Sequence, residues 1–221
     1  MEIKMIDTVI FDLDGTLIDT EKYFKVFWRQ AAVHFGFQMS EEQALSLRSL
    51  GRPFAPALLK EWFGEGFDYI AVREYRRKIM AEHLEKAGIE LKPGAVECLR
   101  WLKENGYRTA LATATPVDRA KAQLAKVGID DLLDEIVSAA QVEKGKPAPD
   151  VYLYACEKLG VEPGQALAVE DSPNGVLSAV AAGIPVVMVP DQTGPDDALS
   201  EKLFACIPDL FALPDILRQT P

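Results

Sequence analysis

Two aspartates separated by a single residue, Asp12 and Asp14, form the first motif in this sequence that indicates chemistry. They come directly after a short apolar run, and Gly15 follows them at once. Two carboxylates this close repel each other and shift each other's pKa values, so the pair calls for a bound cation or a catalytic task. The structural alternative is an ordinary Asp-Gly turn in which an aspartate serves as a cap.

A second acidic pair, Glu170 and Asp171, follows the apolar run at 166–169. Capping of the next helix would explain one of these acids, but it does not explain two acidic pairs after two apolar runs. Several carboxylates in one crevice require a divalent cation, and oxygen-only ligands favour Mg²⁺, which leaves coordination sites open for a substrate phosphate.

Thr113 and Lys146 complete the set of candidate residues. Thr113 ends an apolar run just before a predicted helix, where its hydroxyl and the free backbone amides suit an anion. Lys146 lies in a loop stiffened by Pro147 and Pro149, which would hold its side chain in a defined place. The alternatives are a turn residue for the threonine and a solvated surface charge for the lysine.

Together these residues suit phosphoryl transfer. A carboxylate attacks phosphorus, while a metal ion and a lysine neutralise the oxygens around it. Asp12, at the end of the apolar run, would be the attacking group. Asp14, one step further into the turn, would protonate the leaving oxygen and later deprotonate water.

The elements that must position these residues follow from the apolar pattern. Short apolar runs at 9–11, 107–112, 135–139, 166–169 and 186–189 predict strands, and helices are predicted at 94–104, 115–128, 150–159 and 173–182. This alternation indicates an α/β fold with a doubly wound parallel sheet, whose ligand crevice lies at the carboxyl ends of the strands. Thr115 is the expected N-cap of the second of these helices, with Pro116 at its first position. The tail from 198 predicts a helix, a short extended piece near Ile207 and a final helix or turn.

The segment 20–88 reads as helix throughout and is predicted to be a separate helical unit inserted after the first strand. Ser40 with Gln43 resembles a capping box, and 55–63 and 68–87 predict two further helices. The expected organisation is a core domain formed by 1–18 and 91–221 and an α-helical domain formed by 19–90.

Composition narrows the possible partners. A net charge of −10 repels nucleic acid and anionic membranes, so an anionic ligand would need positive charge concentrated locally. The apolar runs are too short to span a bilayer, and the first seven residues lack the apolar core of a secretory signal. We therefore expect a cytoplasmic monomer with a small-molecule ligand and with no nucleic-acid or membrane partner.

The motifs taken in order resemble those of the haloacid dehalogenase-like (HAD) superfamily of phosphatases, and the match covers nearly the whole chain. The resemblance implies a Rossmann-like core with a helical cap and an aspartyl-phosphate mechanism with Asp12 as nucleophile and Asp14 as acid and base. It implies Mg²⁺ held by the Asp12 carboxylate, the Asp14 backbone carbonyl and Asp171, with Glu170 beside or on the metal. The residues expected to contact substrate are Thr113, Ala114, Lys146 and Arg52, the last of which resembles a cap arginine.

The nearest subgroup resembles beta-phosphoglucomutase and related sugar-phosphate phosphatases. Phe24 stands where the mutase has a cap histidine, and Pro116 stands at or near the place of a lysine that holds the far phosphate of the sugar. These departures favour a phosphomonoesterase acting on a small phosphorylated metabolite, and the subgroup resemblance implies a sugar phosphate. The alternatives are a phosphomutase and a non-catalytic protein that binds a phosphate ligand.

Overall fold

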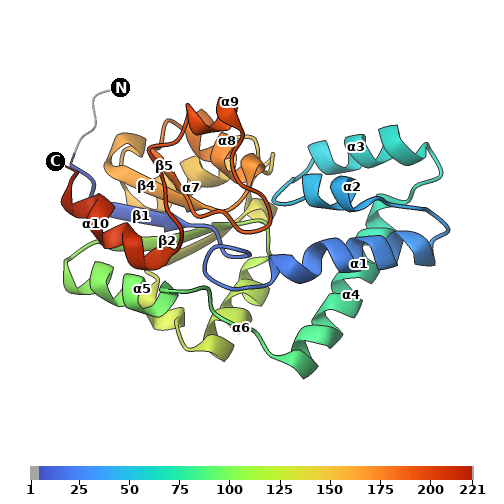
Figure 1. The fold of residues 1–221 in the computed structure, drawn as a ribbon, viewed down its shortest axis with the longest axis horizontal. Coiled ribbons are helices and arrows are strands. Elements are labelled where there is room, and N and C mark those ends of the chain that lie inside the picture. The colour runs from blue at the N-terminus through green and yellow to red at the C-terminus, as the bar shows by residue number, and fades with distance from the viewer. Residues whose placement is uncertain (1–4, 221) are drawn as a thin grey trace.

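The computed structural model describes residues 5–220, so residues 1–4 of the expected core domain and residue 221 lie outside the described residues. The described chain contains a parallel sheet with helices on both faces and a group of helices beside it (Figure 1). The α/β fold class with a doubly wound sheet is confirmed. No helix in the described part combines the length and the apolar character needed to cross a membrane.

The sheet of the described residues has six strands in the order β3-β2-β1-β4-β5-β6, and all its pairings are parallel. The sixth strand is the extended piece expected near Ile207, which pairs with β5 at one edge. The strands are β1 (Thr8–Phe11), β2 (Arg108–Thr113), β3 (Glu135–Ser138), β4 (Ala166–Glu170), β5 (Val186–Met188) and β6 (Ala205–Cys206).

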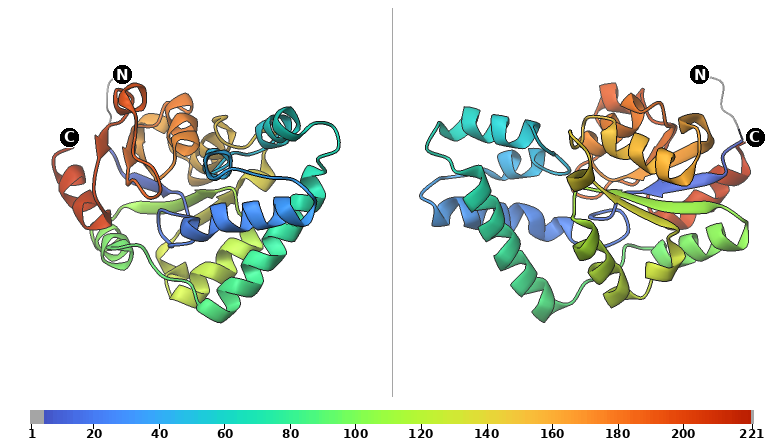
Figure 2. Two further views of the ribbon diagram at one scale, coloured as in Figure 1. Left: turned by 45° about the vertical axis from the view of Figure 1, so that its right-hand side comes forward. Right: turned by 180° about the vertical axis from the view of Figure 1, so that it is seen from behind.

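Both faces of the sheet are buried, which explains why its strands read as continuous apolar runs. Val9 and Phe11 of β1 pack into one apolar cluster, whereas Ile10 packs into the cluster on the opposite face. Helices α5 (Ala95–Glu104), α6 (Val117–Val127) and α10 (Leu213–Arg218) cover the first face. Helices α7 (Asp150–Leu159), α8 (Pro173–Ala181) and the short α9 (Asp197–Ser200) contribute to the second (Figure 2).

Four helices follow β1 and lie to one side of the sheet (Figure 1). They are α1 (Glu21–His34), α2 (Glu41–Ser46), α3 (Phe54–Phe63) and α4 (Tyr69–Ala87). They have an apolar cluster of their own, which includes Trp28, Leu59 and Val72. The predicted capping box of Ser40 and Gln43 is present at the start of α2. The division into two domains stays a prediction.

The strand register brings the candidate residues to one edge of the sheet. Phe11, the last residue of β1, lies opposite Leu111 of β2 on one side and Val169 of β4 on the other. From β1 the chain proceeds to β2 and β3 on one side, and β4, β5 and β6 fill the other side. The strand order therefore reverses at β1, and a ligand crevice is expected at the carboxyl end of that strand.

One local prediction was wrong. Thr115 does not cap α6, because Pro116 occupies the N-cap position and the helix begins at Val117. The Thr115 hydroxyl instead donates a hydrogen bond to Asp14 Oδ2 at 2.9 Å. The Thr115 hydroxyl therefore donates to a distant carboxylate, and no side chain accepts a hydrogen bond from the first backbone N–H groups of α6, as an N-cap threonine would.

Candidate active site

The two aspartates of the first motif lie in different surroundings. Asp12 is 2% exposed, and its backbone N–H donates to the Val169 carbonyl oxygen at 2.9 Å, which continues the pairing of β1 with β4. Asp14 is half-buried, and its carboxylate accepts hydrogen bonds from the hydroxyls of Thr20 and Thr115. The Asp14 side chain is thus oriented by neutral donors, whereas Asp12 is surrounded by charged groups.

Lys146 is fully buried and joins the first acidic pair to the second. Its Nζ atom lies 2.6 Å from Asp12 Oδ1 and 2.6 Å from Glu170 Oε1. The Tyr152 hydroxyl donates to the same Glu170 oxygen at 2.7 Å. Burial alone would lower the pKa of Lys146, but the charges of Asp12 and Glu170 outweigh it and raise that pKa, so the ammonium stays charged.

The three acids Asp12, Glu170 and Asp171 form a buried cluster that fits a cation. Each offers one carboxylate oxygen, and these oxygens lie within 4.8 Å of one another. Both carboxylate oxygens of Asp171 are buried, and no group in the described chain gives them a hydrogen bond. A buried carboxylate without donors is costly unless a charge compensates it, and hard oxygen ligands are those that Mg²⁺ prefers.

The pKa values of these acids reflect the same deficit of positive charge. Burial is the largest cause that raises the pKa of Asp12 to about 7, and the Glu170 and Asp14 charges raise it further against the lowering effect of Lys146. Burial also raises the pKa of Asp171 well above its ordinary value, and the charges of Asp12 and Glu170 add to this effect. A divalent cation in the cluster would favour the ionised form of both groups.

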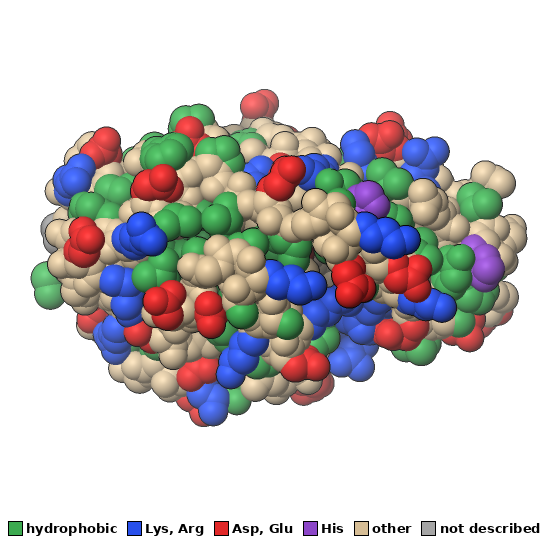
Figure 3. Space-filling model, turned by 90° about the horizontal axis from the view of Figure 1, so that it is seen from below, with side chains coloured by type: hydrophobic (Ala, Val, Ile, Leu, Met, Phe, Trp, Pro, Cys, Tyr) green, Lys and Arg blue, Asp and Glu red, His purple; other side chains and the backbone are tan. Residues whose placement is uncertain are grey.

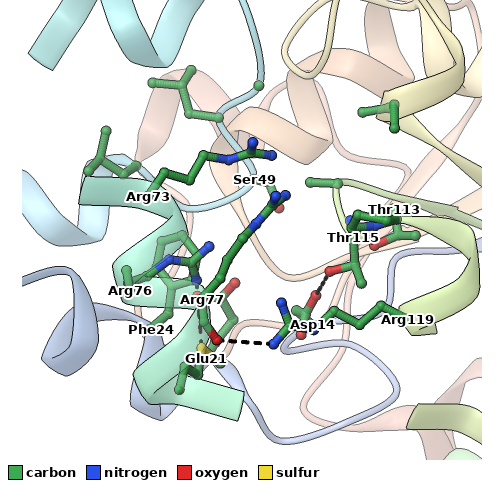
Figure 4. Close-up of a pocket in the computed structure, with 18 of the residues that line it drawn as sticks. Asp14, Glu21, Phe24, Ser49, Arg73, Arg76, Arg77, Thr113, Thr115 and Arg119 are labelled. Carbon is green, nitrogen blue, oxygen red and sulfur yellow. Dashed lines mark hydrogen bonds between the residues drawn. The ribbon is translucent and has the colours of Figure 1, made fainter. Parts of the chain in front are cut away.

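A cavity of about 240 Å³ lies between α1, α4 and the carboxyl edge of the sheet, and Asp12 is among the residues that line it (Figure 4). Of the expected site residues it is lined by Asp12, Asp14, Thr113, Ala114 and Arg52. The remaining three, Lys146, Glu170 and Asp171, are fully buried and do not line it. The structure therefore buries Lys146 away from the cavity, in direct contact with the Asp12 carboxylate.

Thr113 and Arg52 line the cavity from different parts of the chain, the carboxyl end of β2 and the loop before α3. The Thr113 hydroxyl oxygen accepts a hydrogen bond from the Thr115 backbone N–H at 3.0 Å, which leaves its own proton available for a ligand. Arg52 lies on an exposed loop before α3. Two backbone hydrogen bonds tie this loop to the lysine loop, from Gly51 N–H to Lys146 O at 2.8 Å and from Gly145 N–H to Arg52 O at 2.7 Å.

Sequence reasoning missed several residues of the site. Glu21, the first residue of α1, is buried and lines the cavity, and burial together with the Asp171 charge raises its pKa well above the ordinary value. Arg48 is also buried, and its Nη2 atom lies 3.9 Å from Asp171 Oδ2. Neither residue belongs to a recognisable spacing. Four more arginines line the cavity, and three of them carry a helical spacing that was available in the sequence: Arg73, Arg76, Arg77 and Arg119.

Comparison with known proteins gives a consistent family assignment. The family model described as haloacid dehalogenase-like hydrolase matches residues 9–189. The phosphorylated carbohydrates phosphatase of Thermotoga maritima is 33% identical over 186 residues, which cover 80% of this chain and 82% of that protein. Hexitol phosphatase A of Escherichia coli is 35% identical over 182 residues, which cover 81% of each chain.

Solved structures show the same fold. The beta-phosphoglucomutase of Clostridium difficile superposes with a TM-score of 0.81 at 22% identity, covering 97% of this chain and 98% of the other. CbbY of Rhodobacter sphaeroides, solved in complex with phosphate, gives a TM-score of 0.78 at 24% identity, covering 95% and 96%. With the four motifs gathered at one edge of the sheet, these matches lead to one conclusion: the chain belongs to the haloacid dehalogenase-like hydrolase family.

Proposed function

We propose that this chain is a magnesium-dependent phosphomonoesterase that hydrolyses a small phosphorylated metabolite of the sugar-phosphate class. The observation that carries the proposal is the position of Asp12, which lines the cavity while its Oδ1 atom binds the buried Lys146 ammonium. The names of two relatives, a phosphorylated carbohydrates phosphatase and hexitol phosphatase A, support the substrate class.

Asp12 is the nucleophile in this proposal. None of the described residues donates a hydrogen bond to its Oδ2 atom, so that oxygen is free to attack phosphorus. The bond from phosphorus to the leaving oxygen breaks as the new bond forms, and the product is an aspartyl-phosphate. The Lys146 ammonium holds the Oδ1 atom in place and favours the ionised carboxylate.

Asp14 is the general acid and base. It gives its proton to the leaving alcohol in the first step, and in the second it removes a proton from the water that attacks the aspartyl-phosphate. The hydroxyls of Thr20 and Thr115 fix its carboxyl group from two sides. The Thr113 hydroxyl proton is positioned to bind an oxygen of the phosphoryl group.

The buried acids would hold the metal ion. The carboxylates of Asp12 and Asp171 and the backbone carbonyl of Asp14 are the proposed ligands, with Glu170 beside or on the ion. The fit rests on the partnerless Asp171 oxygens and on the 4.8 Å spread of the cluster. When bound, Mg²⁺ supplies positive charge that offsets the charge on the phosphoryl oxygens and on the acids themselves.

The cavity lacks two side chains that a phosphomutase of this subgroup would use. Phe24 lines the cavity at the position where the mutase subgroup has a histidine, and its phenyl ring, unlike an imidazole, has no ionisable proton to transfer. Pro116 also lines the cavity and offers no charge for a second phosphate. The phosphatase interpretation needs neither group.

Release of inorganic phosphate from a panel of sugar phosphates tests the proposal. We expect Mg²⁺-dependent turnover, its loss in EDTA, and a fall of about a thousandfold or more in kcat for Asp12→Asn. Full turnover by that variant would show that another group is the nucleophile. Isomer formation that depends on a bisphosphate activator, without net phosphate release, would establish the mutase alternative instead.

A further inference from the structure

The cavity is cationic on the side that faces away from the sheet. Five arginines and three carboxylates line it, and the carboxylates belong to the catalytic end. Lys and Arg side chains also gather on the surface where the helices α1–α4 meet the rest of the molecule (Figure 3). In a chain with a net charge of −10, this is the local concentration of positive charge that an anionic ligand requires.

Three of the arginines come from α4. Arg73, Arg76 and Arg77 stand at positions i, i+3 and i+4, so a helix presents them on one face. Like charges at this spacing repel each other. Burial is the main cause that lowers the pKa of Arg76 to about 10, and the charges of Arg77 and Arg119 lower it further.

The neighbouring carboxylates do not occupy all the N–H donors of these arginines, so some donors remain available for a ligand. Glu74, on the exposed side of the helix, lies 2.8 Å from Arg77 Nη1 and 3.6 Å from Arg73 Nη1. Arg76 has no carboxylate within ion-pair distance among the described residues, and its buried Nε atom has no hydrogen-bond partner. Its guanidinium is packed instead over the rings of Phe24 and Trp28, 4.6 and 5.2 Å from their centres.

The core contributes a fourth arginine from the other side of the cavity. Arg119 of α6 donates from Nη2 to the backbone carbonyl of Arg77 at 3.4 Å. Figure 4 shows Arg73, Arg76 and Arg77 extending from α4, with Thr113, Thr115 and Arg119 opposite them. The arginines therefore surround the part of the cavity next to the predicted phosphoryl site and are not part of the acidic cluster.

We propose that the substrate carries a second anionic group, a phosphate or a carboxylate, and that Arg73, Arg76 and Arg77 bind it while the scissile phosphate lies at Asp12. This inference rests on the proposed function. The catalytic end already has Thr113 and the proposed metal site for the transferred phosphate, so the α4 arginines are left for another charge. An unpaired, half-buried guanidinium gains the most from such a ligand, because charge-assisted hydrogen bonds would satisfy its remaining donors.

Matched substrate pairs test the inference. Fructose 1,6-bisphosphate is compared with fructose 6-phosphate for a second phosphate, and 6-phosphogluconate with glucose 6-phosphate for a carboxylate. We expect kcat/KM to be at least tenfold higher for the doubly anionic member of one pair, mainly through KM. The pair that shows the preference identifies which anion the arginines bind.

Arginine variants test whether the α4 arginines cause the preference for the doubly anionic substrate. Arg73→Gln and Arg76→Gln should each reduce the ratio of kcat/KM within that pair by about tenfold. Lys78→Gln removes the same charge from an exposed position on α4 that does not line the cavity, and it should leave the ratio unchanged. Equal kcat/KM values within both pairs, or an equal loss for both members in the arginine variants, would overturn the inference.

A binding measurement separates this inference from the proposed function. The Asp12→Asn variant is titrated calorimetrically with both pairs, and a tenfold tighter Kd for the doubly anionic member supports the second anion site without turnover. If the wild-type protein releases phosphate from monophosphates with no preference, only the inference fails. If it releases phosphate from no compound, the proposed function fails, and the calorimetry alone decides whether the arginines bind a second anion.

Discussion

Replacing Lys146 with Met should destabilise the metal-free protein more than any other single change in the site. The methionine keeps the length and apolar character of the side chain but removes its ammonium. That ammonium is fully buried and lies 2.6 Å from both Asp12 Oδ1 and Glu170 Oε1. Its loss leaves two carboxylates buried without their shared cation.

The expected loss is about 3–5 kcal/mol in the free energy of unfolding, the range found when one partner is removed from a buried ion pair. The substitution breaks two ion pairs, those with Asp12 and with Glu170, so we expect a loss near the upper end of this range. The Tyr152 hydroxyl still donates to Glu170, which limits the cost of leaving that carboxylate without the lysine. The loss should shrink as pH falls, because protonation removes the charge that Lys146 compensates, and Asp12 already has a pKa raised to about 7 by burial.

Urea denaturation in EDTA, followed by circular dichroism at pH 7.5 and at pH 5, measures the loss. Lys144→Met is the matched control, since Lys144 is an exposed lysine two residues earlier, and its effect should stay within about 0.5 kcal/mol. Adding Glu170→Gln to Lys146→Met removes one of the two uncompensated charges, so it should restore about 0.5–3 kcal/mol.

A loss below about 1 kcal/mol in EDTA, or one that is independent of pH, would refute this reasoning. Either result would mean that the ammonium does not compensate buried carboxylates in the folded protein. A double variant no more stable than Lys146→Met alone would locate the cost at Asp12 and not at Glu170.

Other predictions concern the glycines and the metal. In Gly175→Ala the new Cβ would lie 2.0 Å from Glu170 Oε2, so displacement of that carboxylate should cost about 1–3 kcal/mol in urea denaturation and weaken Mg²⁺ binding in a titration. In Gly145→Ala the Cβ would lie 2.7 Å from Gly51 Cα, so separation of the two loops should raise KM in steady-state assays without destabilising the sheet. In EDTA, thermal unfolding should show that stability falls as the pH rises from about 4 to 7. Burial raises the pKa of Asp12 in the folded state, so in this range the folded protein binds a proton that the unfolded chain has lost. Mg²⁺ at a hundred times its Kd should add about 2.7 kcal/mol at neutral pH.

Much of the fold was predictable because its signals are local. The apolar run that ends at Phe11 is buried on both faces, as a strand inside a parallel sheet must be. Ser40 and Gln43 form their capping box with each other, three residues apart. The N-cap of α8 is equally local, since the Ser172 side chain accepts from the backbone N–H of Gly175, three residues on.

Predictions failed where a distant residue competed with a local one. Thr115 has the sequence context of an N-cap, but the acceptor that binds its hydroxyl is Asp14, 101 residues away. Glu21 looks like an ordinary acid in the first turn of a helix, yet the fold buries it beside the cavity. The spacing of Arg73, Arg76 and Arg77 indicates a shared helix face, but it does not say whether that face meets solvent or a ligand.

The order of the motifs, the parallel sheet and the carboxyl edge at which acids, hydroxyl and lysine collect could all be predicted from the sequence. These features follow from residue types and from periods of a few residues, which act through the nearby backbone. The position of Lys146 between Asp12 and Glu170, and the position of the α4 arginines on the wall of the cavity, are known only from the folded structure. Such contacts join segments more than twenty residues apart, and their energies depend on burial, which exists only once the chain has folded.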